Sequence, residues 1–307
     1  MGAAQTDRDH LRPLRITVLA GGPSAEREVS LASGQAVAEA LRRRGHTVFV
    51  SDIDADHLEA LDRAADVIFP ALHGTFGEDG TLQRIMEDRG LCFVGSGSWA
   101  SATAMDKAAT KAIAQRLGIP TPEYEVIELG SAVTLAPPVI VKPIAQGSSV
   151  ATSVIKSGPV QPVVDDVAQR FGAALVERFI DGAELTVGIL GGRALPAIRI
   201  QPRREFYDYT AKYEDEGTEY LLDTGFSDKL LARLADWSRT LFEELGCRHL
   251  GRIDWIVTPD EQPWFLEVNT LPGFTSHSLV PKAAQATGIG FDELVERIVR
   301  MALEDHG

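Results

Sequence analysis

Predicted strands and helices alternate along the first hundred residues. Three short apolar runs are predicted to be strands, at 16–19, 48–52 and 67–71. An amphipathic helix is predicted from about Glu28 to Arg44, closed by Gly45. Strands that alternate with helices form a parallel sheet covered by helices, so a Rossmann-like α/β domain is expected. The first turn, residues 21–26, lacks the Gly-x-Gly-x-x-Gly spacing of dinucleotide-binding proteins, which disfavours a dehydrogenase.

The pattern changes after residue 100. Residues 99–118 predict one helix that ends at Gly118, and Pro120 and Pro122 mark a boundary. A smaller α+β unit with one helix is expected next, with strands at 123–127, 139–142, 150–155 and 174–178. Strands at 185–190 and 195–200 open the last part of the chain. The sequence therefore predicts three successive regions of mixed structure.

The C-terminal part contains a polar segment and two predicted helices. The segment from Pro202 to Tyr220 has several charges and no sustained period, which is typical of a functional lid. A helix capped by Ser227 and ended by Gly246 is predicted to bury one apolar stripe of side chains as hydrophobic core. The stripe consists of Leu230, Leu234, Trp237, Leu241 and Leu245. A final helix is expected over about 291–303.

Composition and charge narrow the class of protein. The 307 residues are 44% hydrophobic and 24% charged, as in ordinary globular proteins. The formal charge of −14 argues against a nucleic-acid or anionic-membrane surface, so neither partner is expected. There is no long apolar run, and Cys92 and Cys247 both lie in apolar elements. We therefore expect a cytoplasmic protein with reduced thiols.

A candidate metal site lies in a predicted hairpin. Two segments alternate apolar and polar positions as strands do, at 251–255 and 265–269. A turn centred at 260–261 would set Asp254 opposite Glu267, and the same register sets Arg252 opposite Asn269. Two carboxylates about 5 Å apart repel unless a cation lies between them, and carboxylate and amide oxygens suit Mg²⁺. A solvated polar strand face is the alternative.

A candidate phosphate site follows the strand at 139–142. Lys142 ends this strand, and the next loop contains Gly147 and two serines. Backbone amides in such a loop can approach phosphate oxygens, while the lysine supplies the opposite charge. An ordinary turn with a surface lysine is the alternative. Lys107, in an Ala-rich helix, is by itself expected to be a surface charge. The connector at 176–180 could present backbone groups to an adenine edge, and Glu184 could hold ribose hydroxyls.

Four residues in predicted loops are further candidates for a functional site. Gly273 can offer a backbone N–H to an oxyanion, and Ser278 could attract a carboxylate to a helix N-terminus or be a plain N-cap. His73 follows the third strand, where α/β sheets bind ligands, although it could equally satisfy local hydrogen bonds. Glu26 follows the first strand and could pair with a substrate ammonium group or only favour the next helix N-terminus.

Several motifs in this order resemble those of D-alanine–D-alanine ligases, which are ATP-grasp enzymes. The resemblance spans about residues 15–303. It rests on Ser24-Ala-Glu-Arg-Glu-Val-Ser30, His73-Gly and Gly77-Glu-Asp-Gly80, Met105-Asp-Lys107, Phe206-Tyr-Asp-Tyr-Thr-Ala-Lys-Tyr213, Gly251-Arg-Ile-Asp254, Glu267-Val-Asn-Thr-Leu-Pro-Gly273 and Ser276-His-Ser-Leu279. It implies an α/β chain with an N-terminal Rossmann-like (pre-ATP-grasp) domain followed by a two-lobed ATP-grasp fold. The domains would be residues 1–100, 101–183 and 184–307.

The resemblance also implies an ATP site between the second and third domains. Phosphates would be bound by Lys107, Lys142 and Lys212. Glu177 and Ile180 would contact adenine and Glu184 the ribose, and Ser148 and Leu266 would belong to the same nucleotide site. Two Mg²⁺ ions, for which Mn²⁺ could substitute, would be held by Asp254, Glu267 and Asn269.

The implied substrates are two D-alanine molecules. The first, bound near His73 with its ammonium group on Glu26, would be converted into an acyl phosphate. The amine of the second would attack it, with Arg252 and the Gly273 amide stabilising the tetrahedral oxyanion. Ser278 and Leu279 would hold the second carboxylate. Tyr213, in a mobile loop at 203–220, would hydrogen-bond toward Glu26 and Ser148 and favour D-alanine over D-lactate.

The sequence departs from the family pattern in two places. The family's loop Gly-Ser-Ser-x-Gly has Ala151 in its last position here, and alanine tolerates only part of glycine's backbone range. The central domain is short around 130–137 and 158–164. We expect an ATP-dependent ligase that makes a peptidoglycan precursor dipeptide as a homodimer. The alternatives are an ATP-grasp ligase with a different amino-acid or hydroxy-acid acceptor, and a non-catalytic nucleotide-binding homologue.

Overall fold

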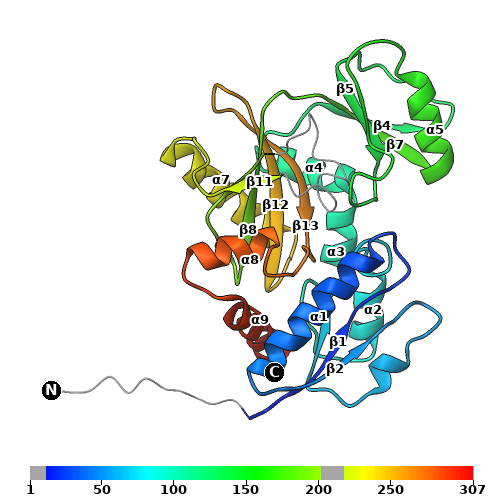
Figure 1. Cartoon of the computed structure of the whole chain (residues 1–307). Coiled ribbons are helices and arrows are strands. Elements are labelled where there is room, and N and C mark those ends of the chain that lie inside the picture. The colour runs from blue at the N-terminus through cyan, green and yellow to red at the C-terminus, as the bar shows by residue number, and fades with distance from the viewer. Residues whose placement is uncertain (1–11, 202–217, 307) are drawn as a thin grey trace.

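The computed structural model describes residues 12–201 and 218–306, and its strands form three separate sheets (Figure 1). The first sheet is parallel, in the order β2-β1-β3, with β1 at Arg15–Leu19, β2 at Thr47–Ser51 and β3 at Val67–Pro70. Its helical segments are α1 (Arg27–Arg43), the 3₁₀ helix η1 (Glu59–Asp62) and α2 (Thr81–Asp88). The parallel sheet with its crossover helix confirms the α/β pattern expected for this part of the chain.

The second sheet is antiparallel, in the order β4-β7-β5-β6, and α5 packs against it. Its elements are β4 (Tyr124–Glu128), β5 (Val139–Pro143), β6 (Ser153–Ile155), α5 (Gln161–Phe171) and β7 (Ala173–Arg178). The predicted strand at 150–155 is too long, because the chain is still in a turn with left-handed backbone at Ala151 and pairs with β5 only from Ser153. The single predicted helix of this unit is confirmed.

The predicted helix at 99–118 is two helices, α3 (Ser98–Met105) and α4 (Lys107–Arg116). Between them Asp106 has extended backbone, and its carboxylate accepts a hydrogen bond of 2.9 Å from the backbone N–H of Ala109. An aspartate that caps in this way starts a new helix, so the expectation of one continuous helix was wrong. The break makes Lys107 the first residue of α4.

The third sheet has the order β11-β10-β8-β12-β13, with β9 paired to β8. Its elements are β8 (Ala183–Leu190), β9 (Arg193–Ala194), β10 (Ile198–Gln201), β11 (Glu219–Leu221), β12 (Leu250–Val257) and β13 (Pro263–Asn269). The predicted strand at 195–200 begins only at Ile198, because the N–H of Leu195 instead bonds back to the carbonyl of Gly188 and extends the β8–β9 hairpin.

Two helices cover opposite faces of the third sheet. Leu185, Val187 and Ile189 of β8 belong to the core formed with α7 (Asp228–Glu244), whose predicted cap at Ser227 is confirmed. A Cβ placed on Gly188, between them, would face Val280 of α8 (Leu279–Ala286). Because successive side chains of a strand point to opposite faces, α7 and α8 lie on different sides of the sheet.

The last helix, α9 (Phe291–His306), packs against the first sheet (Figure 1). Its apolar side chains share one hydrophobic core with β1, β3 and α1. The imidazole of His46 lies 2.7 Å from the carboxylate of Glu296, and Arg43 pairs with Asp292 at 2.7 Å. The C-terminal helix therefore ties the first sheet to the rest of the chain. The domain bounds given above stay a prediction.

Within the two described ranges, no helix has both the length and the apolar character needed to cross a membrane.

Candidate active site

The β12–β13 hairpin has the predicted register. Asp254 pairs with Glu267 and Arg252 pairs with Asn269. Beyond Asp254 the register shifts by one residue, so that Trp255 pairs with Phe265 and Leu266 is the extra residue of a β-bulge. A bulge re-aims nearby side chains, and Leu266 lines a cavity beside the hairpin.

Asp254 is a buried, fully engaged carboxylate. Arg252 approaches it as a fork, with Nε 2.9 Å from Oδ1 and Nη2 2.8 Å from Oδ2. The hydroxyl of Thr186, on the neighbouring strand β8, donates a 2.7 Å hydrogen bond to Oδ1. Since Asp254 is only 4% exposed, the alternative of a solvated polar strand face is wrong at this position. A bidentate pair of this kind holds the guanidinium in one orientation.

Lys107 is buried beside the hairpin, and not the surface charge that its helix alone suggested. Its Nζ lies 3.5 Å from the carboxylate of Glu267 and donates a 2.7 Å hydrogen bond to the carbonyl of Gln146. Burial lowers the pKa of Lys107, and the negative charge of Glu267 opposes this effect. An ammonium group with so little water around it is a strong candidate partner for an added anion.

A second buried cluster, which we call the lysine–glutamate cluster, consists of Lys111, Lys142 and Glu177. The carboxylate of Glu177 lies 2.8 Å from Nζ of Lys111 and 2.5 Å from Nζ of Lys142. Burial by itself would raise the pKa of Glu177, but the two lysines hold it at about 2. The same carboxylate raises the pKa of Lys142 against the effect of burial. The interpretation of Lys142 as a surface lysine is therefore wrong.

Lys111 was missed by the sequence analysis. Burial lowers the pKa of this lysine, and its Nζ also donates a 2.8 Å hydrogen bond to the hydroxyl of Thr121. That hydroxyl in turn donates to the carbonyl of Phe265 in β13, at 2.9 Å. The signal that could have revealed Lys111 is its spacing of four residues from Lys107, which places both on one face of α4.

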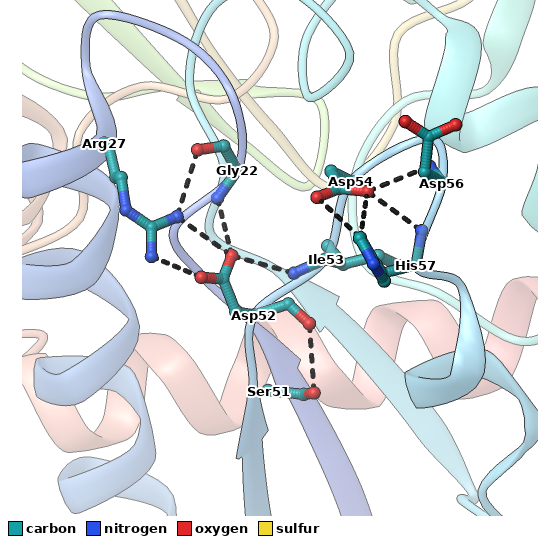
Figure 2. Close-up of polar contacts among 8 residues, drawn as sticks. All are labelled: Gly22, Arg27, Ser51, Asp52, Ile53, Asp54, Asp56 and His57. Atoms are coloured by element: carbon teal, nitrogen blue, oxygen red, sulfur yellow. Dashed lines mark hydrogen bonds and ion pairs between the residues drawn. The ribbon is translucent and has the colours of Figure 1, made fainter.

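Glu26 stands at the start of α1, on a turn that Asp52 holds in place. Figure 2 shows the carboxylate of Asp52 accepting hydrogen bonds from the backbone N–H groups of Gly22 and Ile53, both at 2.9 Å. Arg27 pairs with the same carboxylate and donates to the carbonyl of Gly22 at 3.1 Å. These bonds close the turn between β1 and α1, which fixes the position from which Glu26 enters the site.

The carboxylate of Glu26 contacts the loop after β5. It accepts a short hydrogen bond from the hydroxyl of Ser148, and it makes no capping bond to the amides of α1. The alternative that Glu26 only favours its helix N-terminus is therefore not supported by its contacts. This bond joins the first region of the chain to the predicted phosphate loop.

The phosphate loop has left-handed backbone at three residues that are not glycine. The φ angles are 49° at Ser148, 57° at Ser149 and 51° at Ala151. A residue with a Cβ is strained in this region by about 1–2 kcal/mol. Ala151 therefore occupies the backbone conformation for which the family's glycine is suited.

Replacing Ala151 by Gly should change the thermodynamic stability little. The substitution removes about 1–2 kcal/mol of strain, while the greater freedom of the unfolded chain takes back about 0.4–1 kcal/mol. A net gain between about 0 and 1.6 kcal/mol is expected, measured as the free energy of unfolding in urea. A loss of stability would contradict the strain at Ala151. Ala145→Gly, earlier in the loop at a residue without positive φ, is the control and should lower stability slightly.

The segment after β13 is held by its own side chains. Asn269 Oδ1 accepts a 3.0 Å hydrogen bond from the N–H of Leu271. The hydroxyl of Ser278 accepts a 3.0 Å bond from the N–H of Thr275 and none from the first turn of α8. The plain N-cap interpretation of Ser278 is thus not supported, although the residue does precede α8. Gly273 lies between these anchors with its backbone facing a cleft.

His73 makes local hydrogen bonds with both ring nitrogens. Nδ1 lies 3.1 Å from the carbonyl of Leu271, and Nε2 lies 3.4 Å from the hydroxyl of Ser33. Glu78, whose pKa is raised by burial, lies 3.7 Å from Nδ1. Although burial opposes it, this carboxylate raises the pKa of His73. His73 is thus bonded within the protein and also lines the larger cavity, so its role toward a ligand stays a prediction.

Two adjoining cavities bring the predicted residues together. The larger has a volume of about 590 Å³, and its predicted members are Glu26, His73, Lys107, Ser148, Arg252, Glu267, Asn269, Gly273, Ser278 and Leu279. The smaller has about 160 Å³, and its predicted members are Lys107, Lys142, Ser148, Glu177, Ile180, Glu184, Leu266 and Glu267. Lys107, Ser148 and Glu267 line both, so the two cavities meet at these residues.

Among the described residues, one predicted site residue lines neither cavity. Asp254 is covered by Arg252 and lines neither cavity. Lys212 and Tyr213 lie outside the described residues, as does most of the predicted lid. In the part of the chain that the structure describes, no three His, Cys, Asp or Glu side chains are grouped as a metal site. Any divalent ion here would need other oxygen ligands in addition to Asp254 and Glu267.

Known sequences match the chain over nearly its whole length. Residues 50–96 match the profile described as D-ala D-ala ligase N-terminus, and residues 113–300 match that described as D-ala D-ala ligase C-terminus. A protein of Syntrophotalea carbinolica named D-alanine--D-alanine ligase is 44% identical over 297 residues, covering 95% of this chain and 97% of the relative. The chain belongs to the D-alanine–D-alanine ligase family. A second relative of that name, from Anaeromyxobacter sp., is 42% identical and covers 93% and 96%.

Solved structures of D-alanine–D-alanine ligases have the same fold. The enzyme from Bacillus anthracis superposes with a TM-score of 0.86 at 32% identity, covering 95% of this chain and 98% of the other. A structure of the same enzyme described as complexed with ATP gives a TM-score of 0.82 at 28% identity, with the same coverage. These likenesses confirm the predicted α/β fold class with its ATP-grasp part.

Proposed function

We propose that this chain joins two D-alanine molecules into D-alanyl-D-alanine while converting ATP to ADP and phosphate. Membership of the D-alanine–D-alanine ligase family supports the reaction type, and the relative described as complexed with ATP supports the nucleotide. The observation that carries the proposal is the meeting of two cavities at Lys107, Ser148 and Glu267. The smaller cavity is lined by Lys107 and Lys142. The larger cavity is lined by Arg252 and by the loop that contains Gly273.

The smaller cavity is the proposed nucleotide site. Lys107 and Lys142 would offset phosphate charge, with Lys212 joining them, and the loop at Ser148 would offer backbone N–H groups. Ile180 and Leu266 would supply apolar contacts to the base, and Glu184 would accept bonds from ribose hydroxyls. The carboxylate of Glu177 is already engaged by two lysines, so we assign it the positioning of Lys142 in addition to the adenine contact.

The proposed ligands of two Mg²⁺ ions are Asp254, Glu267 and Asn269. Glu267 and Asn269 line the larger cavity, whereas Asp254 would have to share its oxygens between an ion and its present partners Arg252 and Thr186. Asp254 and Glu267 are register partners, and Asn269 follows on the same face of β13. Magnesium is bound by one or two carboxylates together with water and substrate phosphate, so a closed cage of protein ligands is not required. The bound ion would neutralise charge on the phosphates. Mn²⁺, which accepts the same oxygen ligands, could substitute.

The larger cavity is the proposed amino-acid site. Glu26 would hold the ammonium group of the first D-alanine, with His73 nearby. The carboxylate of that D-alanine would attack the γ-phosphorus of ATP and release ADP, which gives an acyl phosphate. The amine of the second D-alanine would then attack the activated carbonyl, and the adduct would expel phosphate and lose a proton to give the dipeptide. Arg252 and the Gly273 N–H would stabilise the oxyanion, an effect worth about 3–4 kcal/mol per donor.

Other parts of the proposal concern specificity and setting. Ser278 and Leu279, at the start of α8, would hold the carboxylate of the second D-alanine. Tyr213 would select D-alanine over D-lactate. The product serves peptidoglycan synthesis in the family, so we propose a cytoplasmic role for this chain. We also propose a homodimer, as the family resemblance implies.

The decisive experiment is an acceptor panel. The purified protein with ATP and Mg²⁺ should release ADP and form dipeptide when D-alanine is added, and neither with L-alanine. Turnover with D-lactate but not with D-alanine would instead favour a hydroxy-acid acceptor. Absence of turnover with every amino acid, despite ATP binding, would favour a non-catalytic nucleotide-binding homologue and would overturn the proposal.

A further inference from the structure

We propose that Ser33, a buried serine of α1, is a positioning residue that holds the Gly273 amide in place for the dipeptide-forming step. The proposal rests on the function proposed above, because it gives Ser33 a purpose only if Gly273 stabilises the oxyanion. Ser33 lines neither cavity and is 0% exposed. It can therefore act only through its neighbours.

The hydroxyl of Ser33 contacts the oxyanion loop, residues 270–275, at the residue after Gly273. It accepts a 3.2 Å hydrogen bond from the backbone N–H of Phe274. The N–H of Gly273 itself makes no hydrogen bond to any described residue, whereas those of Phe274 and Thr275 are each bound by a serine. The bond to Phe274 N holds the peptide plane that follows Gly273. The Gly273 N–H lies in the preceding plane, between Pro272 and Gly273, so its direction is restricted only if the chain is also held before Gly273, at the carbonyl of Leu271.

His73 completes a closed set of hydrogen bonds around this loop. A carbonyl can only accept, so Nδ1 of His73 must donate to the carbonyl of Leu271 at 3.1 Å. Nε2 lies 3.4 Å from the Ser33 hydroxyl and can bond to it in either charge state of the ring, because the hydroxyl donates to a neutral imidazole and accepts from a charged one. With Phe274 N–H donating to Ser33, each polar atom of the set has a partner. His73 and Ser33 thus bond to the loop on opposite sides of Gly273, at Leu271 and at Phe274.

The helix that carries Ser33 is itself rigidly placed on the first sheet. A Cβ on Gly34 would lie 2.4 Å from the Cβ of Ala20, so the absence of a side chain lets α1 approach β1 closely. One turn earlier, the hydroxyl of Ser30 donates to the carbonyl of Ala71 at 2.7 Å and accepts from the N–H of Gly21 at 2.8 Å. The position of Ser33 is therefore set by the first sheet. Through its hydrogen bond to Phe274, Ser33 in turn positions the oxyanion loop relative to that sheet.

The oxyanion forms only in the second chemical step, which gives the inference a specific readout. If the Gly273 N–H is misdirected, attack by the second amine slows while formation of the acyl phosphate does not. The accumulating acyl phosphate is then open to water, which attacks its carbonyl and returns D-alanine and phosphate. The ratio of dipeptide formed to ADP released should therefore fall. Loss of general structural integrity would lower both rates together and leave this ratio unchanged.

The test compares Ser33→Ala with two other variants in the full-length protein. In Ser33→Ala we expect the dipeptide-to-ADP ratio to fall about tenfold, less than the 10²-fold that a 1 Å misplacement can cause, with the KM for ATP largely unchanged. Ser33→Cys, whose sulfur is a weaker acceptor, should fall between Ser33→Ala and the native protein. Ser238→Ala is the matched control. It also removes a fully buried helix hydroxyl, which binds Trp255 Nε1 at 3.0 Å, and it should destabilise the protein without changing the ratio.

The outcomes separate the two proposals. If the native protein forms dipeptide and Ser33→Ala keeps a ratio of dipeptide to ADP equal to the native one, the role of Ser33 is wrong while the function stands. The same conclusion follows if Ser238→Ala lowers the ratio as much as Ser33→Ala does. If the native protein forms no dipeptide at all, the proposed function fails first. Should Ser33→Ala not fold, the ratio measured for Ser33→Cys decides, with an unchanged ratio counting against the inference.

Discussion

Replacing Arg252 by Ala should lower the kcat of dipeptide formation by about 10²–10³-fold, the loss seen when one donor to an oxyanion is removed. Arg252 reaches the larger cavity from β12, and the fork that it forms with Asp254 holds its guanidinium in one orientation. A preorganised donor of this kind needs no rearrangement as charge develops on the reacting carbonyl. ATP binding should be largely intact, because Arg252 does not line the smaller cavity. Steady-state kinetics with a dipeptide assay, together with ATP titration, measure both effects.

Two controls make this result specific. Arg252→Lys keeps the charge but loses the bidentate geometry, so its activity should lie nearer to the Ala variant than to the native protein. Arg199→Ala removes an arginine from β10 of the same sheet, outside both cavities, and should keep native activity. Normal turnover by Arg252→Ala would show that the assigned role is wrong. Equal loss in Arg199→Ala would point to a general effect on the sheet.

Replacing Glu177 by Gln should lower the free energy of unfolding by about 3–5 kcal/mol, the cost of removing one partner from a buried ion pair. The substitution keeps the shape of the side chain but leaves Lys111 and Lys142 with no opposite charge in the lysine–glutamate cluster. Urea denaturation measures the difference. Glu123→Gln is the matched control, because Glu123 pairs with Arg178 on the same sheet but is mostly exposed. Its expected cost is below about 1 kcal/mol.

The native protein and the Glu177→Gln variant should also differ in how their stability responds to acid. The pKa of Glu177 is lowered from 4.5 to about 2 in the folded state, so its contribution to stability is present above pH 4.5 and is lost as the pH falls toward 2. The Gln variant lacks this titration. The stability difference between native protein and variant should therefore shrink through that window. A difference that stays constant down to pH 2.5 would show that the charge of Glu177 is not what stabilises the fold.

Local patterns were enough to predict the β12–β13 hairpin and the α/β order of the first sheet. The alternation of side chains at 251–255 and 265–269 fixed which groups share a face, and the register of Asp254 with Glu267 followed from it. The break at Asp106 was harder, because an Ala-rich stretch has the same helical period on both sides of a cap. The start of β6 was missed for a similar reason, since left-handed backbone at an alanine leaves no mark in the sequence.

The buried charges could not be predicted from local patterns, because their state depends on partners far away in the chain. Lys111 shares a helix face with Lys107, but this spacing does not tell whether that face is buried. Only the fold brings Glu177, from β7, to 2.8 Å from its Nζ. Lys107 likewise becomes a buried charge only when β13 brings Glu267 beside it. The resemblance to a family supplied the roles of Lys107 and Lys142, but it pointed to neither Lys111 nor Ser33.

The place of α9 has a consequence for how the protein is made. Its side chains complete the core of β1 and α1, and His46 and Glu296, which join them, are 250 positions apart in the chain. During translation the first sheet leaves the ribosome long before its cover has been synthesised. Its apolar surface must stay exposed, or be shielded by a chaperone, until the residues of α9 have emerged. Nascent chains that stop early would present that uncovered surface to the cell.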